Sequence, residues 1–330
     1  MAEYKIIHDT VYGSIKLSGL MLELLESPEV QKLAGIHQLG LAYLVFPGAN
    51  HTRLEHSLGT SFIAGRIANE LSLEENESDL VKCAALLHDI GHGPFSHTLE
   101  MMVHQKTGHS HMELTAKLIT GKIDIFSDEE SKVITGRKTL PEIIEKYGLA
   151  PPEIADLITS PPEDTKTATL ESYQDKSSQQ FFNPKVYLNQ IIHGEIDADQ
   201  IDYLMRDSHY TGIAHGIIDV DRLIQTMEIY NNDLVIHRRG LSAVEGMLVA
   251  RSLMYSSIYF HKTVRIAELM LARAAEAAKK DHEMPELYRM ADSDLLNYLR
   301  SLGGFPAEIE RKLKYRRLYK KVLSLSPTEL

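Results

Sequence analysis

The 330-residue chain contains a single cysteine, Cys83, and no run of apolar residues that approaches the ~20 needed to span a bilayer. One thiol excludes an intrachain disulfide framework. The first residues, MAEYKIIHD, lack a charged segment followed by an apolar one, so we expect a soluble, cytoplasmic protein with no membrane partner. Positive charge is also scarce, because 35 Lys and Arg stand against 46 Asp and Glu and give a net charge of -11. This acidic balance argues against broad attraction to nucleic acid or anionic membranes.

Helical spacing dominates what the chain does contain. A hydrophobic content of 43% over this length is enough for a large buried core. Apolar and polar residues alternate around Gly13 in YKIIHDTVYGSIKLSG, which predicts a small N-terminal β-hairpin. Most later segments, such as SDLVKCAALLHDI and DQIDYLMRD, place apolar residues at intervals of three and four, and NNDLVIHRRG is the clearest other strand candidate. We therefore predict a mainly α-helical protein.

Composition changes between residues 121 and 184, where serine, proline and charged residues are frequent and large apolar residues are few. This predicts an inserted, partly mobile segment. The end of the chain has the pattern of two amphipathic helices broken at GGFP, and its basic stretch KYRRLYKK is typical of a solvated helix face. The expected organisation is a core in two parts, 1–120 and 185–275, the variable insertion 121–184, and a C-terminal helical lobe, 276–330.

Histidine is concentrated in one region, since nine of the 16 histidines lie between His37 and His111. In AALLHDIGHG, His88 and Asp89 come at the end of an apolar helix that glycines terminate. Two ionisable groups at a buried helix end need compensation, and a divalent cation would supply it. Imidazole and carboxylate are common ligands of Zn, Mn and Fe. The sequence therefore indicates a metal site at this point.

Two residues do not complete a metal site, so further donors must come from other segments. HTRLEHSLG offers His51, Glu55 and His56, and GEIDADQIDYLMRD offers Asp197, Asp199 and Asp202. Asp197 is equally explained as a helix N-cap, and Asp202 as the partner of Arg206 four residues on. Asp199 differs, because Tyr203 and Asp207 follow it on one helix face and together resemble the wall of a pocket.

The order HTRLEH, HDIGHGPFSH, DADQIDYLMRDSHYTG resembles the HD-domain phosphohydrolases, in which H…HD…D ligands hold a divalent metal within a helical bundle. The longer stretches IHQLGLAYLVFPGANHTRLEHSLG and IDADQIDYLMRDSHYTGI are similar to the dGTPase-like deoxynucleoside triphosphate triphosphohydrolases, especially the branch containing the SAM-and-HD-domain enzyme. The resemblance covers 5–115 and 190–265 well, the C-terminal helices loosely, and 121–184 hardly at all. It implies an HD-domain helical bundle that hydrolyses dNTPs at the α-phosphorus to deoxynucleoside and tripolyphosphate.

The resemblance also implies roles for individual residues. For a divalent ion (Mn, Fe, Mg or Zn), it implies the ligands His56, His88, Asp89 and Asp199. For catalysis, it implies His97 as proton donor to the 5′ oxygen with Glu100, where the family has Asp, behind it, and His92 and His111 as phosphate contacts. For the substrate, it implies sugar, base or phosphate contacts from Gln38, Leu39, Arg53, Tyr203, Asp207, Arg251, Tyr259, His261 and Lys262.

Other functions stay open on sequence grounds. One alternative is another HD reaction, on a nucleoside monophosphate or an alarmone, and a second is a nucleotide-sensing or single-stranded nucleic-acid-binding protein with little turnover. The resemblance further implies a homo-oligomer, dimer or tetramer, and a possible regulatory nucleotide, which in the resembling branch is a guanine nucleotide bound between subunits. Lys5 and Gln31 match positions of that regulatory site, whereas Glu26 stands where Asp is expected and Ala34 where Arg is expected.

Overall fold

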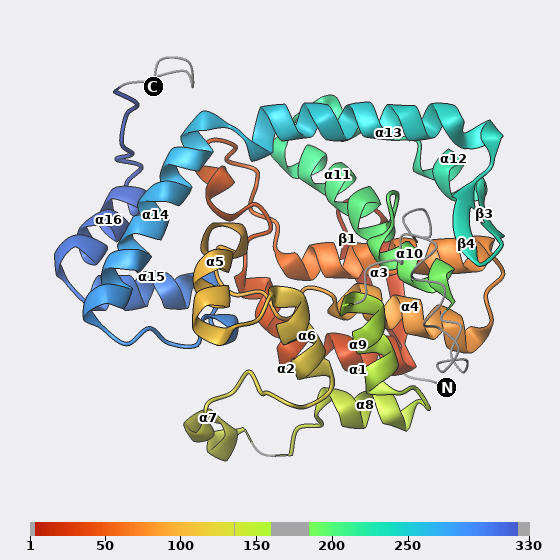
Figure 1. Ribbon diagram of the computed structural model, residues 1–330, viewed down its shortest axis with the longest axis horizontal. Coiled ribbons are helices and arrows are strands. Elements are labelled where there is room, and N and C mark those ends of the chain that lie inside the picture. The colour runs from red at the N-terminus through yellow and green to blue at the C-terminus, as the bar shows by residue number, and fades with distance from the viewer. Residues whose placement is uncertain (1–3, 135, 160–184, 323–330) are drawn as a thin grey trace, which may run out of the picture.

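The computed structural model describes residues 4–134, 136–159 and 185–322, and it opens with the predicted hairpin (Figure 1). Strand β1 (Tyr4–Asp9) pairs antiparallel with β2 (Gly13–Ser18). The Asp9 carboxylate accepts hydrogen bonds from the backbone N–H groups of Val11 and Tyr12, which closes the turn. Gly13 follows with a φ of +75°, a conformation that glycine adopts without strain.

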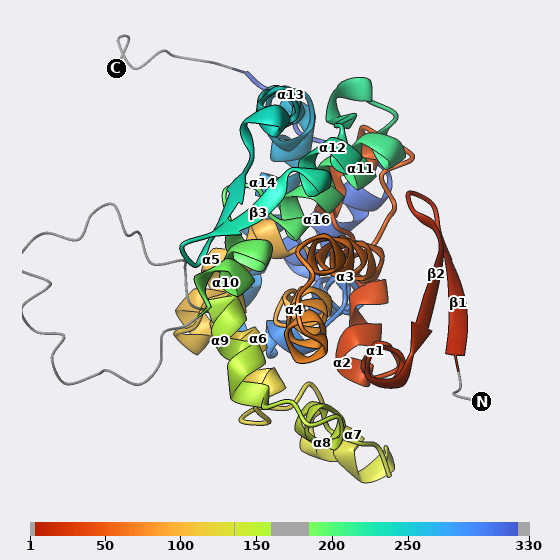
Figure 2. The ribbon, with the colours of Figure 1, turned by 90° about the vertical axis from the view of Figure 1, so that its right-hand side faces the viewer.

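A helical bundle follows the hairpin and confirms the mainly α prediction. Helices α1 (Gly19–Leu25) and α2 (Pro28–Gln31) lead through two 3-10 turns, Lys32–Gly35 and Gly40–Leu44, to the long α3 (Arg53–Glu70). Helix α3 packs along α4 (Glu75–Leu87) and α11 (Ala198–Thr211). Figure 2 looks along α3 and α4 and shows the hairpin at the edge of the bundle, beside α1.

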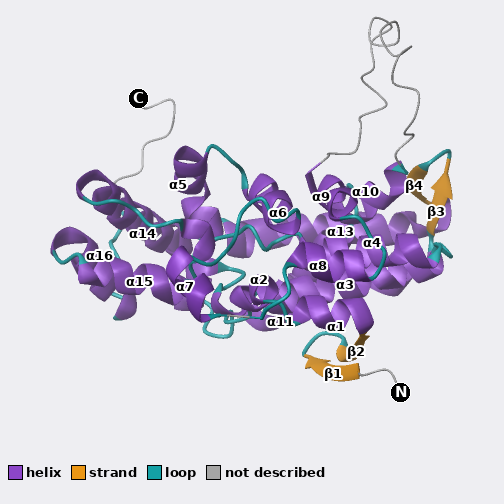
Figure 3. Ribbon diagram, turned by 90° about the horizontal axis from the view of Figure 1, so that it is seen from below, coloured by secondary structure: helices purple, strands orange, loops and turns teal. Residues whose placement is uncertain are grey.

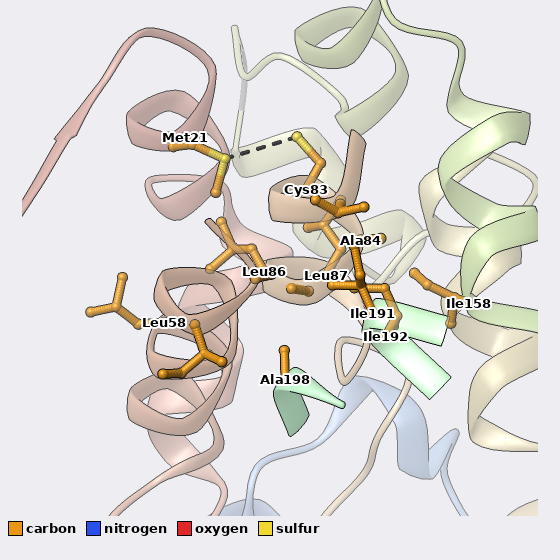
Figure 4. Close-up of a cluster of buried hydrophobic side chains, with 14 of the residues drawn as sticks. Met21, Leu58, Cys83, Ala84, Leu86, Leu87, Ile158, Ile191, Ile192 and Ala198 are labelled. Carbon is orange, nitrogen blue, oxygen red and sulfur yellow. Dashed lines mark hydrogen bonds between the residues drawn. The ribbon is translucent and has the colours of Figure 1, made fainter. Parts of the chain in front are cut away.

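The bundle core surrounds α4. Leu86 and Leu87 are fully buried there, and Ile191 of α10 (Val186–His193) is buried in the same cluster (Figure 4). Cys83 is also fully buried, 3.9 Å from the Met21 sulfur. Burial raises the pKa of its thiol, so this cysteine has the environment of a packing residue.

Part of the expected insertion belongs to this core. After α5 (Ser96–Thr107) and α6 (His111–Ile119), the chain forms α7 (Asp128–Val133), α8 (Leu140–Lys146) and α9 (Pro151–Thr159). Ile144, Ile154 and Ile158 are fully buried against the bundle. Helices α8 and α9 therefore pack as part of the core, where the composition had indicated an inserted, partly mobile segment. Residues 160–184 lie outside the described residues. The division into domains stays a prediction.

The second half of the chain adds a hairpin and a lobe. Helix α12 (Val220–Gln225) precedes β3 (Met227–Tyr230) and β4 (Asp233–Ile236), so NNDLVIHRRG does contain a strand, and its partner is an adjacent segment that the sequence did not mark. Helix α13 (Leu241–Met254) ends in a π-helical turn, Tyr255–Tyr259.

The C-terminal lobe consists of α14 (Lys262–Asp281), α15 (Asp292–Ser301) and α16 (Gly304–Lys314). As predicted, the last two helices break at GGFP. Ala274, Leu295 and Ile309 belong to a second buried cluster, which also takes in Leu99 of α5. Figure 3 shows this lobe at one end of the molecule and the β3–β4 hairpin at the other. None of the helices in the described part of the chain combines the length and apolarity that crossing a bilayer requires.

Candidate active site and metal centre

A pocket of about 540 Å³ lies where the start of α3, the loop after α4, α11 and the π-helical turn meet. Its walls come from segments that are far apart in the sequence. The structure brings together in this pocket most of the side chains that the sequence predicted: Gln38, Leu39, Arg53, His56, His88, Asp89, His92, His111, Asp199, Tyr203, Asp207, Arg251 and Tyr259.

Three of these residues could hold a metal ion. One ligand atom each of His56, His88 and Asp199 lies within 4.8 Å of the other two. Nδ1 of His88 donates to the backbone carbonyl of Ala85 at 2.7 Å, so its Nε2 is left for the pocket. Nδ1 of His56 is likewise bound, to Asp202 at 2.8 Å. The Nδ1 atom of each histidine is thus hydrogen-bonded away from the pocket. The two Nε2 atoms and the Asp199 carboxylate form a donor set that fits a divalent ion.

The protonation of His56 agrees with this fit. Burial lowers the pKa of His56, but hydrogen bonds to Asp199 and Asp202 outweigh burial and raise the pKa to about 10. Nε2 of His56 lies 3.0 Å from Asp199 Oδ1. A proton therefore occupies the position between imidazole and carboxylate where an ion would bind.

Asp89, the fourth predicted ligand, lies beside this cluster. Its carboxylate accepts a short hydrogen bond from Arg53, and its Oδ1 lies 3.3 Å from Nε2 of both His88 and His92. Burial opposes ionisation, but the charge of Arg53 holds the pKa of Asp89 well below its usual range. The Arg53 side chain is 2% exposed and also donates to Ser96 at 3.0 Å, so its guanidinium is fixed in direction.

The two histidines assigned to phosphate contact stack on each other. The rings of His92 and His111 are 4.0 Å apart and nearly parallel. Burial, with the charge of Arg53, lowers the pKa of His92 and keeps that ring neutral. Nδ1 of His111 lies 2.5 Å from Glu100, so Glu100 orients His111, a contact that the sequence did not predict.

Tyrosines line one wall of the pocket that contains the metal cluster. Asp207 accepts from the Tyr259 hydroxyl at 2.7 Å and is bound to His51 Nε2 at 2.8 Å. His51, offered by the sequence as a metal donor, thus fixes Asp207 instead. The rings of Tyr203 and Tyr259 lie 6.2 Å apart at 73°, in edge contact.

Several predicted residues lie elsewhere. His261 accepts from the backbone N–H of Thr263 as the N-cap of α14 and packs edge-on against Phe46, and neither it nor the exposed Lys262 lines the pocket. Glu100 also lies outside the lining. The side chain of His97 lies outside what the structure describes, so its role stays a prediction.

Asp292 is the functional neighbour that the sequence analysis missed. From the start of α15, its carboxylate accepts from the backbone N–H of Phe95 at 2.9 Å and from both the backbone N–H and Nδ1 of His37. His37 and Phe95 line the pocket. Phe95 has a φ of 46°, a strained value for a non-glycine residue that this contact helps to hold. Gln200 and Tyr255 are further lining residues that went unmarked.

The residues of the implied regulatory site lie near one another, away from this pocket. Lys5 donates a short hydrogen bond to Glu26, and both side chains are about half exposed. Gln31 donates to the Leu25 carbonyl at 2.7 Å. Ala34 is exposed in the same region.

Comparisons with known proteins agree with this architecture. The HD domain family matches residues 53–207, and the HD associated region matches 218–330. An uncharacterized protein of Methanocaldococcus jannaschii is 35% identical over 99% of this chain and 61% of its own length. Deoxynucleoside triphosphate triphosphohydrolase SAMHD1 of Bos taurus is 29% identical over 98% of this chain and 59% of its own length. The chain thus spans about three fifths of these curated relatives.

A solved structure shows the same fold. The phosphohydrolase of Bacteroides thetaiotaomicron superposes with a TM-score of 0.73 at 29% identity, covering 99% of this chain and 81% of that one. The chain belongs to the HD-domain family of phosphohydrolases. Members of this family are metal-dependent, and His56, His88 and Asp199 are the group here that could hold the ion.

Proposed function

We propose that the protein hydrolyses deoxynucleoside triphosphates at the α-phosphorus and releases deoxynucleoside and tripolyphosphate. The observation that supports this most is that the His56, His88 and Asp199 donors share one pocket with the guanidinium groups of Arg53 and Arg251. A volume of about 540 Å³ suits a small ligand of this kind. Cationic side chains beside metal donors favour a substrate with several phosphates, which agrees with the activity named for the bovine relative.

The phosphate end of the substrate would meet the metal cluster. When bound, a divalent ion supplies charge neutralisation at the phosphate oxygens and an activated water. Arg53 and Arg251 would bind further phosphate oxygens, and Asp89 keeps Arg53 aimed into the pocket. The neutral His92 ring and its partner His111 would hydrogen-bond the same group.

Departure of the leaving group requires a proton at the 5′ oxygen. We assign that donation to His97, on the resemblance to the family alone. Asp89 together with the trio of His56, His88 and Asp199 completes the proposed ligand set.

The sugar would lie against the tyrosine wall. Asp207 is held by His51 and Tyr259 and presents its carboxylate toward the pocket, where it would accept from the 3′ hydroxyl. Tyr203 lines the same wall beside Tyr259, and its ring would leave no partner for a ribose 2′ hydroxyl. A homo-oligomer and a regulatory nucleotide at the Lys5 region are part of the same proposal.

Product analysis tests this function. Metal-stripped protein is reloaded with Mn, Fe, Mg or Zn and incubated with each dNTP and rNTP, and chromatography identifies nucleoside and phosphate products together. Tripolyphosphate supports the proposal. Orthophosphate alone indicates another HD reaction, and ion binding without product indicates a nucleotide sensor.

A pair of variants links the activity to the metal cluster. Replacing both His88 and Asp89 with Ala should abolish turnover and lower bound metal, while the helical circular dichroism stays largely unchanged. The control is His104→Ala, a histidine of α5 outside the pocket, which should keep both activity and metal. Unchanged metal content in the double variant would contradict the metal assignment.

A further inference from the structure

His56 is held at both of its ring nitrogens by residues of one helix. Nε2 lies 3.0 Å from Asp199, and Nδ1 lies 2.8 Å from Asp202 Oδ2. Asp199 is one third exposed and lines the pocket, whereas the side chain of Asp202 is fully buried and does not. Asp202 therefore reaches the site through its hydrogen bond to His56.

Asp202 is itself fixed on its far side. Arg206 grips it with two parallel hydrogen bonds, from Nε to Oδ2 at 2.9 Å and from Nη2 to Oδ1 at 3.0 Å. The third guanidinium nitrogen donates to Asp9 of the N-terminal hairpin at 2.8 Å. All three side chains are at most 2% exposed. A bidentate pair without access to water has one geometry, so the Asp202 carboxylate cannot turn away from His56.

Helix α3 is shaped around this pair. Gly59 lies so close that a Cβ there would be 1.9 Å from Asp202 Oδ1 and 2.3 Å from Arg206 Nη2. Glycine is thus required here because the Asp202 and Arg206 side chains lie against the backbone of α3, and not because of its backbone conformation. His56 stands three residues earlier on the same helix, so α3 supplies both the ligand and the room for the group that orients it.

We propose that Asp202 is a positioning residue of the metal centre: it accepts the Nδ1–H of His56 and so fixes the ring with Nε2 toward Asp199 and His88, where the Nε2 lone pair would bind an ion that displaces the Nε2 proton. The proposal rests on the metal site of the proposed function. A flipped ring would present C–H, and the other tautomer would present N–H, where the ion needs a lone pair. His88 achieves the same orientation with a backbone carbonyl, that of Ala85.

Asp202→Asn tests the proposal with little change in side-chain volume. Oδ2 of Asp202 accepts from both His56 Nδ1 and Arg206 Nε, and Oδ1 accepts from Arg206 Nη2. An amide has one oxygen for these two positions, so either orientation places its NH₂ against a donor, and the carboxylate charge that holds the Nδ1–H of His56 is lost. Isothermal titration of metal-stripped protein with Mn²⁺ should show affinity about 10- to 100-fold weaker than in the unmodified protein. In a His56→Ala background the same change should have no further effect on Mn²⁺ affinity.

Asp9→Asn is the matched control, because Asp9 contacts the same guanidinium but not Asp202 or His56. Both variants should unfold at lower urea concentration when measured in chelator, and only Asp202→Asn should lose Mn²⁺ affinity. Equal affinity losses in the two variants, or no loss in Asp202→Asn, would overturn the positioning role. If the unmodified protein binds no divalent ion, the metal site of the proposed function fails and this proposal fails with it.

A measurement on the unmodified protein keeps the test independent of how the variant folds. Nitrogen-15 NMR of the Zn²⁺-loaded protein reports which ring nitrogen of His56 carries the proton. The proton is expected on Nδ1, with Nε2 bound to the ion. A proton on Nε2 would overturn the proposal even if every variant behaved as described.

Discussion

Gly59→Ala should destabilise the protein, although alanine is the better helix former. The added Cβ would lie 1.9 Å from Asp202 Oδ1 and 2.3 Å from Arg206 Nη2, so one of these groups must move by more than 1 Å. Neither can move into water, since both are fully buried. Breaking a buried pair costs about 3–5 kcal/mol, and alanine returns about 1 kcal/mol of helix propensity. The free energy of unfolding should therefore fall by about 2–4 kcal/mol.

Gly65→Ala is the matched control on the same helix. A Cβ at Gly65 would meet only the flexible side chain of Lys82, at 3.4 Å from Cδ, an ordinary contact. The same substitution should therefore raise stability there, by about 1 kcal/mol. Urea unfolding of the metal-free proteins, followed by circular dichroism, gives both values. If the free energy of unfolding changes by the same amount and sign in both variants, the close packing of Gly59 against the Asp202–Arg206 ion pair does not make alanine unfavourable at this position.

Three further outcomes are expected. An unpaired 2′ hydroxyl against Tyr203 costs roughly 1–3 kcal/mol, so dATP should be hydrolysed about one to two orders of magnitude faster than ATP. Equal rates would show that Tyr203 does not select against the ribose. Because Glu26 and Ala34 depart from the residues expected at the guanine site, activity and sedimentation should not depend strictly on GTP; a GTP-driven rise in both would show that the substitutions do not matter. The pKa of His56, raised from 6.5 to about 10, contributes stability that is fully present below pH 6.5 and lost toward pH 10. Urea unfolding in chelator should therefore show a decline over that range which His56→Asn removes, and parallel pH profiles would contradict the assignment.

The sequence was informative where one short segment carries both the chemistry and its local geometry. His88 and Asp89 stand at the end of an apolar helix, and the glycines after it let the chain turn closely: a Cβ at Gly91 would lie 2.2 Å from the backbone oxygen of His111. The residue types of such a segment reflect its buried surroundings. His88 and Asp89 could therefore be marked as candidate metal donors from the sequence, and the helical fold could be predicted.

In the α8 and α9 region, averaging the amino-acid composition over a long segment hid the pattern of buried residues. LPEIIEKYGLAPPEIADLI repeats apolar residues at intervals of three and four, and Ile144 and Ile154 are fully buried. The prolines stand in the first turns of α8 and α9, where a missing N–H costs nothing. Taken together with the polar residues 160–184, the stretch was interpreted as one insertion, because proline and charge outweighed the periodicity in the average.

The sequence contains no comparable signal for contacts between residues that are far apart in the chain. The spacing of Asp202 and Arg206 predicted their ion pair, and the structure contains it, yet nothing in the sequence marks the hydrogen bond from His56, 146 residues earlier. Asp292 gave even less signal, because an aspartate in the first turn of a helix is already explained by its favourable interaction with the helix dipole. Its carboxylate instead serves two backbone N–H groups of the pocket, 197 and 255 residues away.

The position of Asp292 also changes how the C-terminal lobe relates to the site. If the lobe were an appendage, its polar residues would be satisfied within it or by water. Asp292 is instead 4% exposed and holds His37 and the strained Phe95, both of which line the pocket. Phe95 also packs in the apolar cluster of α14, α15 and α16. One wall of the pocket is therefore supported by a residue of the C-terminal lobe.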